Sequence, residues 1–317
     1  MKLRRGITLL VRGLLGLTVA ITLAIALLWW LSVRQIVAES EVVETAAGPV
    51  EVSRLGEAAG QSILLVHGSP GGYDQLLPLA RALSAHGHHS VAMSRPGYLR
   101  TPLSVGRTPE EQADAMAALV RELDLAPVVV VAVSGGGPST LQLALRHPEL
   151  VRGVVLICAV TSRFREGEPD PDQVRAFDLA WDLGALAGRW SPGTGLQFLG
   201  VSDSERRSTL LANEETAAAV RYLFQSMGFN SRRHGGYRND VLTMDWNDLD
   251  YPLESLRAPV LLLHGADDVN VPLAHSRKVA DRAPDAALRV LEGAGHAFFV
   301  VEREWLEAQI ADFLQKL

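Results

Sequence analysis

Short apolar runs alternate with longer amphipathic windows along most of this chain. The runs are continuously apolar and rich in Val, Ile and Leu, which is typical of parallel strands covered on both faces. The windows between them have the length and the period of helices. The pattern predicts an α/β fold, a mostly parallel sheet flanked by helices. The expected strands are Ser62–His67, His89–Ser94, Val128–Val133, Val151–Ile157, Val260–His264 and Ala287–Leu291, and the expected helices are Tyr73–His86, Pro109–Asp124, Pro138–Arg146, Leu273–Arg282 and His296–Leu317.

Two regions depart from this alternation. Glu41–Thr45 and Val50–Arg54 are short β-like runs separated by Ala-Ala-Gly-Pro, which predict an antiparallel hairpin ahead of the sheet. Residues 161–251 contain no strand-like run, and residues 161–250 hold ten of the chain's 19 aromatic side chains. We interpret 161–251 as a helical cap inserted into an α/β core that comprises 41–160 and 252–317.

The first 40 residues follow a third pattern. Residues 13–33 form a stretch of 21 residues without a charge, long enough as a helix to cross the roughly 30 Å hydrocarbon layer of a membrane. A basic segment, 1–12, precedes this stretch and a linker, 34–40, follows it. The excess of positive charge on the N-terminal side predicts a single-pass membrane protein with a cytoplasmic N-terminus and an extracytoplasmic folded domain. The alternative is a secreted protein whose signal peptide is cleaved near Ile36-Val37-Ala38.

Composition narrows the range of partners. The chain has 317 residues and a mean hydropathy of +0.12, and the apolar excess is concentrated in 13–33. Residues 13–317 carry 26 basic and 36 acidic side chains, a formal charge of −10, which argues against a nucleic-acid partner. With Cys158 as the single cysteine, the chain forms no internal disulfide and no Cys-rich metal site. We expect neither a metal nor an organic cofactor, and the composition specifies no oligomeric state.

One strand leads directly into a serine flanked by small residues. Val128–Val133 is followed by Ser134-Gly135-Gly136-Gly137-Pro138 and then by a helical window. A nucleophile elbow needs small neighbours because its sharp strand-to-helix turn leaves no room for side chains. The G-x-S-x-G pattern is filled here as Ala132-Val133-Ser134-Gly135-Gly136, with Ala at the first position. A phosphate-binding loop or a plain turn is the alternative, but the G-x-G-x-x-G spacing and the P-loop Lys are missing.

Five motifs together resemble the α/β-hydrolase family, over Glu41 to Leu317. Each is modest evidence alone, but they occur in the family's order with suitable spacing. The resemblance implies a capped serine hydrolase. The motifs are His67-Gly68-Ser69-Pro70-Gly71-Gly72, similar to the HG-x-P oxyanion loop; Ser94-Arg95-Pro96-Gly97-Tyr98, similar to D-x-P-G-Y/F-G with Ser94 in place of Asp; the elbow; His264 to Pro272; and Gly293-Ala294-Gly295-His296.

A serine hydroxyl is a weak nucleophile, so Ser134 needs a base and a carboxylate that orients the base. We expect His296 to be the base because it follows the last strand-like run on a small-residue loop. His67 and His264 end strands before Gly and are expected to shape loops by hydrogen bonding. Asp268 matches the family's acid position three residues ahead of Val-Pro. The alternatives are the adjacent Asp267 and, for both acids, a helix cap ahead of Leu273.

The oxyanion of a tetrahedral intermediate needs two backbone N–H donors. Gly135 follows the nucleophile and is expected to supply one of them. Ser69 occupies the family's position for the other, in the loop after the first parallel strand. The next residue, Pro70, has no backbone N–H.

These residues predict acyl transfer to water, with Ser134 attacking the carbonyl of a small-molecule carboxylic ester or related acyl substrate. Because the nucleophile is Ser and not Asp, epoxide hydrolase and haloalkane dehalogenase chemistry is disfavoured. The aromatic cap is expected to form an apolar roof for an acyl or aryl group. The alternatives are a proline iminopeptidase-like aminopeptidase, although the motifs HGGPG and GGSWG are absent, a cofactor-free perhydrolase or haloperoxidase, and a non-catalytic binding protein.

Overall fold

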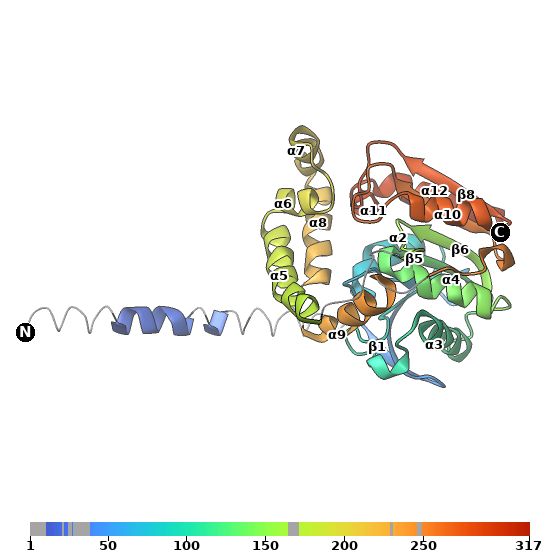
Figure 1. The fold of residues 1–317 in the computed structure, drawn as a ribbon, viewed down its shortest axis with the longest axis horizontal. Helices are drawn as coiled ribbons and strands as arrows, with labels where there is room; N and C mark the ends of the chain where they lie inside the picture. The colour runs from blue at the N-terminus through green and yellow to red at the C-terminus, as the bar shows by residue number, and fades with distance from the viewer. Residues whose placement is uncertain are drawn as a thin grey trace, which may run out of the picture. The chain divides into compact units, whose positions relative to one another are not determined.

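Eight strands form one sheet in the order β1-β2-β4-β3-β5-β6-β7-β8 (Figure 1). The last six in this order pair in parallel, whereas β1 and β2 form an antiparallel hairpin whose second strand also pairs antiparallel with β4. The mostly parallel sheet and the hairpin expected from the sequence are therefore confirmed. The strands are β1 Glu41–Thr45, β2 Gly48–Leu55, β3 Ser62–Val66, β4 His89–Met93, β5 Val128–Val133, β6 Val151–Ile157, β7 Val260–Gly265 and β8 Ala286–Leu291.

The computed structural model describes residues 11–20, 22–24, 27, 39–163, 171–228, 231–245 and 249–317. The chain divides into two compact units, Met1–Glu39 and Ser40–Leu317. The second unit contains the sheet and all the helices discussed below.

The predicted membrane anchor and the localisation built on it are corrected by the structure. Among the described residues, no helix is both long and apolar enough to cross a membrane. Of the predicted span 13–33, residues 13–20, 22–24 and 27 are described, and they are helical. The rest of the predicted span at 21, 25–26 and 28–33 lies outside the described residues, as do 1–10 and most of the linker.

Helices cover both faces of the sheet, which explains why its strands are continuously apolar. Side chains alternate between the two faces along a strand. Val130 and Ala132 of β5 pack into the main core with α3, α4 and α10. On the opposite face, Gly153 of β6 leaves room for Phe313 and Leu317 at the C-terminal end of the chain. The helices around the sheet are α2 Leu77–Ala85, α3 Pro109–Glu122, α4 Gly137–Arg146, α10 Ala274–Arg282, α11 Phe298–Val301 and α12 Arg303–Lys316.

Two of the expected helices are divided. Tyr73–His86 begins with a 3₁₀ turn, Tyr73–Leu76, before α2 starts. The last helix is divided into α11 and α12 at Glu302, whose φ of −112° and ψ of 44° are not helical. The helical windows of the sequence were therefore placed correctly, and these breaks within them were not foreseen.

Five helices lie between β6 and β7 in the described part of the chain. In Figure 1, α5 to α8 lie together, and α9 lies next to the sheet. α5, α6 and α8 pack around the ring of Phe224, and a Cβ built at Gly188 or Gly195 would lie 2.5 Å from that ring. Asp203 and Asn213 begin α7 and α8 as N-caps. The bounds are α5 Pro171–Trp190, α6 Pro192–Phe198, α7 Ser204–Ala212, α8 Glu214–Met227 and α9 Ser231–Asp240.

A buried glutamate on β2 lies beside Ser94, which stands where the family motif has Asp. Ser94 Oγ donates to Glu51 Oε2 (2.9 Å), and Arg100 Nε donates to Glu51 Oε1 (2.7 Å). The Glu51 side chain is fully buried, whereas Arg100 is partly exposed. A carboxylate therefore lies beside this turn although position 94 is Ser, and β2 supplies it. It connects the hairpin to the loop that follows β4.

Replacement of Glu51 tests this connection. Glu51→Gln is expected to lower the free energy of unfolding by about 3 kcal/mol, because Arg100 loses its buried partner. Urea denaturation followed by circular dichroism measures the change. Glu41→Gln is the matched control on the same hairpin, because Glu41 forms an exposed ion pair with Arg54 and its loss should cost less than about 1 kcal/mol. Equal losses in the two variants would contradict the assignment.

Candidate active site

Ser134 stands at the sharp turn between β5 and α4. Its φ of 49° lies in the left-handed region, which costs a residue other than glycine about 1–2 kcal/mol. A Cβ built at Gly136 would lie 2.8 Å from Val66 O, and one at Gly137 would lie 2.2 Å from Val160 O. The backbone of the turn therefore packs directly against its neighbours. The turn has the strained strand-to-helix form of a nucleophile elbow.

The structure brings His296 and Asp268 together by a hydrogen bond of 2.7 Å between Nδ1 and Oδ2. The other carboxylate oxygen of Asp268 accepts the backbone N–H groups of Asn270 (2.8 Å) and Val271 (2.9 Å). Burial acts to raise the pKa of Asp268, but the hydrogen bond from His296, the attraction of that ring's protonated form and the backbone N–H of Val271 are among the contributions that together outweigh burial and hold this pKa below its ordinary value. Asp268 therefore stays ionised and keeps a proton on Nδ1, which leaves Nε2 as the basic nitrogen.

The two acidic candidates have different environments. Asp268 is buried against His296, whereas the adjacent Asp267 is exposed. His264 Nε2 donates to Val271 O (2.9 Å) and lies 3.5 Å from Asp268 Oδ2. Burial lowers the pKa of His264, which favours the neutral ring. These bonds confirm that His264 shapes the loop that carries Asp268.

Cys158, which the sequence analysis did not assign to the site, lies at the end of β6. Its Sγ is 4.0 Å from His296 Nε2. Burial and the charge of Asp268 raise the pKa of this thiol well above its ordinary value, so it remains protonated. Cys158, Asp268 and His296 are the group in the described part of the chain whose atoms are close enough to hold a metal ion. Because the hydrogen bond between Asp268 and His296 already uses two of these groups, the arrangement fits proton transfer better than metal binding.

The loop after β3 passes over the nucleophile. A Cβ built at Gly68 would lie 3.0 Å from Ser134 Cβ, so only glycine fits there without displacement. The N–H of Gly68 donates to Gln75 Oε1 (2.7 Å) and is occupied. Pro70 has no N–H, so the N–H that this part of the loop can direct at an oxyanion is that of Ser69.

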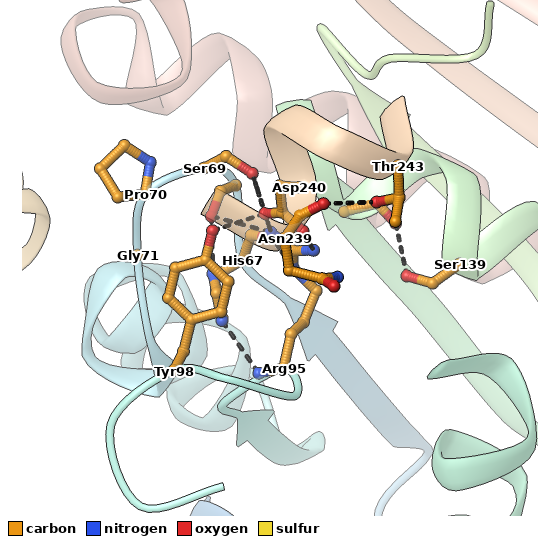
Figure 2. A network of polar contacts seen from close by, with 12 residues as sticks. His67, Ser69, Pro70, Gly71, Arg95, Tyr98, Ser139, Asn239, Asp240 and Thr243 are labelled. Carbon is orange, nitrogen blue, oxygen red and sulfur yellow. Dashed lines mark hydrogen bonds and ion pairs between the residues drawn. The ribbon is translucent and has the colours of Figure 1, made fainter. Parts of the chain in front are cut away.

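A buried polar network contacts the same loop through Ser69 (Figure 2). Arg95 and Asp240 form an ion pair in which both side chains are only 2% exposed. Asp240 belongs to α9, and Arg95 follows β4. Both contact Ser69, because Arg95 Nη2 donates to Ser69 Oγ (2.9 Å) and that hydroxyl donates to Asp240 Oδ2. Tyr98 also donates its hydroxyl to Asp240 Oδ2.

His67 connects this network to the sheet. Its Nε2 accepts the backbone N–H of Arg95 (2.9 Å), and its Nδ1 donates to Gly68 O (2.6 Å). Burial and the charge of Arg95 lower the pKa of His67 well below its ordinary value, so the ring is neutral. His67 therefore shapes the loop by hydrogen bonding, as expected from the sequence.

A second ion pair joins α9 to the loop, and here the helix supplies the positive member. Arg233 of α9 donates to both carboxylate oxygens of Asp74 (2.7 and 3.0 Å) and to Gly71 O (2.7 Å). The sequence analysis missed both pairs, because their members are about 145 and 159 positions apart. Buried charges are stable only when paired, and the pairing partner is visible only in the fold.

An apolar crevice lies next to the site, between α8 and the helices that cover the sheet. Its volume is about 50 Å³, enough for roughly four groups the size of a water molecule. Val133, which precedes Ser134, and Phe299, whose ring meets the edge of His296, line it together with Leu223 of α8. Ser134, Asp268 and His296 do not themselves line the crevice, which has room for a small apolar group.

Comparison with known proteins identifies the family. Residues 61–302 match the alpha/beta hydrolase fold, so the chain belongs to this family. An alpha/beta hydrolase fold protein from Nakamurella multipartita superposes with a TM-score of 0.75 at 32% identity, over 86% of this chain and 98% of that one. A pimeloyl-[acyl-carrier protein] methyl ester esterase from Aromatoleum aromaticum is 32% identical, over 69% of this chain and 85% of that protein. A non-heme chloroperoxidase from Kitasatospora aureofaciens is 28% identical, over 81% and 93%.

A further buried histidine supports the loop after β6. His275 Nδ1 accepts the backbone N–H groups of Thr161 (3.1 Å) and Ser162 (3.2 Å), so this nitrogen carries no proton. Burial lowers the pKa of His275 to about 4, and repulsion from the protonated form of His264 and from Lys278 acts in the same direction. As the pH falls, His275 therefore becomes protonated at a lower pH in the folded protein than in the unfolded chain.

This difference predicts a pH dependence of stability. Between the ordinary pKa of 6.5 and the folded value of about 4, the unfolded chain holds more of the His275 proton, so stability is lost as pH falls through this window. The loss reaches about 1.4 kcal/mol per pH unit. In His275→Asn, Asn Oδ1 can accept the same N–H groups without titrating. Urea unfolding at several pH values should therefore show a smaller slope for the variant, and identical slopes would contradict the assignment.

Proposed function

We propose that this protein is a serine hydrolase that cleaves carboxylic esters through Ser134, His296 and Asp268. The observation that carries the proposal is the 2.7 Å bond between His296 and a buried, ionised Asp268, two residues of loops at the edge of the sheet where Ser134 stands on a strained strand-to-helix turn. A carboxylate in this position orients the imidazole and stabilises its protonated form. The strained turn exposes the serine hydroxyl at the edge of the sheet.

The proposed reaction has two steps. In the first, His296 Nε2 takes the proton of Ser134 Oγ while that oxygen bonds to the substrate carbonyl carbon, and the proton then passes to the leaving alcohol. In the second, water attacks the acyl-enzyme, gives a proton to His296, and releases the acid as Ser134 regains its hydrogen. The N–H groups of Ser69 and Gly135 stabilise the oxyanion in both steps, and loss of one such donor typically costs about 3 kcal/mol.

Two further observations support an ester as the substrate. A relative that is 32% identical is a methyl ester esterase by name. The crevice lined by Val133 and Phe299 has mainly apolar walls, which suits the acyl part of a small ester.

The nucleophile is tested with a fluorophosphonate probe. Ser134 Oγ is expected to bond to phosphorus with loss of fluoride, and Ser134→Ala should abolish labelling. Cys158→Ala is the matched control, because its thiol lies 4.0 Å from His296 Nε2 but should contribute no nucleophile, so this variant should label within about threefold of wild type. Mass spectrometry of the labelled peptide identifies the site. A folded wild-type protein that does not label would overturn the proposal.

The substrate class is tested with p-nitrophenyl esters and aminoacyl arylamides. The ester should be hydrolysed faster in wild type, and activity should disappear in Ser134→Ala. Faster hydrolysis of a prolyl arylamide would instead support the aminopeptidase, and activity only with peroxide and halide would support the perhydrolase.

The crevice predicts a preference for short acyl chains. In wild type, kcat/KM should be higher for p-nitrophenyl acetate and butyrate than for the octanoate, because the crevice has room for only a few groups. Leu223→Ala should shift the preference toward the longer chain by about tenfold, since one or two methylene groups contribute about 1–2 kcal/mol. Leu196→Ala is the control, because Leu196 is equally buried in the same cluster but does not line the crevice. An equal shift in both variants would exclude this binding mode.

A further inference from the structure

We propose that the side chain of Ser69 is a positioning group, through which Asp240 on α9 directs the Ser69 backbone N–H toward the oxyanion. This inference rests on the proposed function and extends it, because it gives Asp240, in the segment between β6 and β7, a part in the reaction. The proposal concerns the hydroxyl of Ser69, whereas the oxyanion contact itself belongs to its backbone.

The hydroxyl hydrogen of Ser69 is donated to a carboxylate. Arg95 Nη2 donates to Ser69 Oγ, and a guanidinium has no acceptor. Of the two acceptors beside this hydroxyl, Asp240 Oδ2 and the Tyr98 hydroxyl, the carboxylate oxygen is the stronger and takes the hydrogen. Both bonds involve ionised groups in a buried setting, which makes them stronger than bonds between neutral groups. The side chain of Ser69 is thus held from two sides (Figure 2).

The same guanidinium holds the backbone on the sheet side of Ser69. Arg95 Nε donates to His67 O (3.0 Å), and His67 Nε2 accepts the Arg95 backbone N–H. On the other side of Ser69, Arg233 donates to Gly71 O (2.7 Å). The peptide of Ser69 therefore lies between two carbonyl groups, those of His67 and Gly71, that are each held by an arginine. The hydrogen bonds of the Ser69 hydroxyl hold the chain at a third place between them.

Asp240 can act as a reference point because α9 is itself closely packed against the core. A Cβ built at Gly236 would lie 2.2 Å from the ring of Tyr98, and one at Gly97 would lie 2.7 Å from Gly236 Cα. Gly236 N–H donates to Gly97 O (2.8 Å). This direct backbone contact, together with the two buried ion pairs, leaves α9 little freedom to move relative to the loop.

A purely structural role for the network is the competing explanation. It is separable because Ser69 and Tyr98 donate their hydroxyls to the same atom, Asp240 Oδ2. Ser69→Ala and Tyr98→Phe each remove one hydrogen bond to that oxygen and leave the ion pair of Arg95 and Asp240 intact. Ser69→Ala removes a side chain of the loop that carries the proposed oxyanion donor, whereas Tyr98→Phe removes a neighbouring hydroxyl and keeps the bond between Ser69 and Asp240.

Steady-state kinetics with p-nitrophenyl acetate test the proposal. Ser69→Ala should lower kcat by about ten- to a hundredfold with KM within about twofold of wild type, because a displaced donor is felt in the transition state. Tyr98→Phe should leave kcat within about twofold, although thermal unfolding should show a comparable loss of stability in both variants. Ser69→Thr, which restores a hydroxyl, should recover most of the lost kcat.

The outcomes separate this proposal from the proposed function. A wild-type protein that neither hydrolyses the ester nor labels with the fluorophosphonate would refute the function. An active wild type with unchanged kcat in Ser69→Ala would refute only the positioning role, as would equal losses of kcat in Ser69→Ala and Tyr98→Phe. Failure of Ser69→Thr to recover kcat in a folded protein would also count against the positioning role.

Discussion

The carboxyl ends of neighbouring parallel strands meet at one edge of the sheet, and the candidate site depends on this arrangement. The register pairs Val66 of β3 with Ala132 of β5, and Ile157 of β6 with Leu263 of β7. Each loop that leaves these strands therefore begins at nearly the same height. Groups separated by up to about 230 positions in the sequence converge there without any long connection across the sheet. The strained φ of Ser134 is tolerated because strands on both sides hold β5 in place.

A second theme is the treatment of buried charge. α9 contributes Arg233 and Asp240, and each is paired with a residue of opposite charge from the α/β core. Each ion pair therefore carries no net charge. Such pairs add little net stability compared with apolar residues, but an unpaired member is strongly destabilising. Here each pair connects α9 to residues at or next to the loop after β3. Glu51 follows the same logic on the hairpin, where it replaces a carboxylate that the family motif places on β4.

The sheet and its flanking helices could be predicted because their signals are local. A continuous apolar run such as Val128–Val133 needs only its own residues to indicate a buried strand, and the elbow lies directly after it. The motifs also led to the hydrogen-bonded pair of Asp268 and His296. The bonds of Asp240 could not be foreseen, since a charged residue on a polar helix is usually solvated. The N-terminal prediction was wrong, because no helix among the described residues is both long and apolar enough to cross a membrane.

The insert between β6 and β7 is built in two ways. α5, α6 and α8 are held by an apolar cluster around Phe224, whereas α9 is held to the core by paired charges and a direct contact between glycine backbones. Apolar clusters accept exchanges of similar volume, but paired buried charges and glycine contacts do not. Substitutions accumulating over evolution can therefore reshape the apolar crevice through α8 while α9 keeps the loop after β3 unchanged. The shape of the crevice and the geometry of the loop can in this way diversify separately within one segment of the chain.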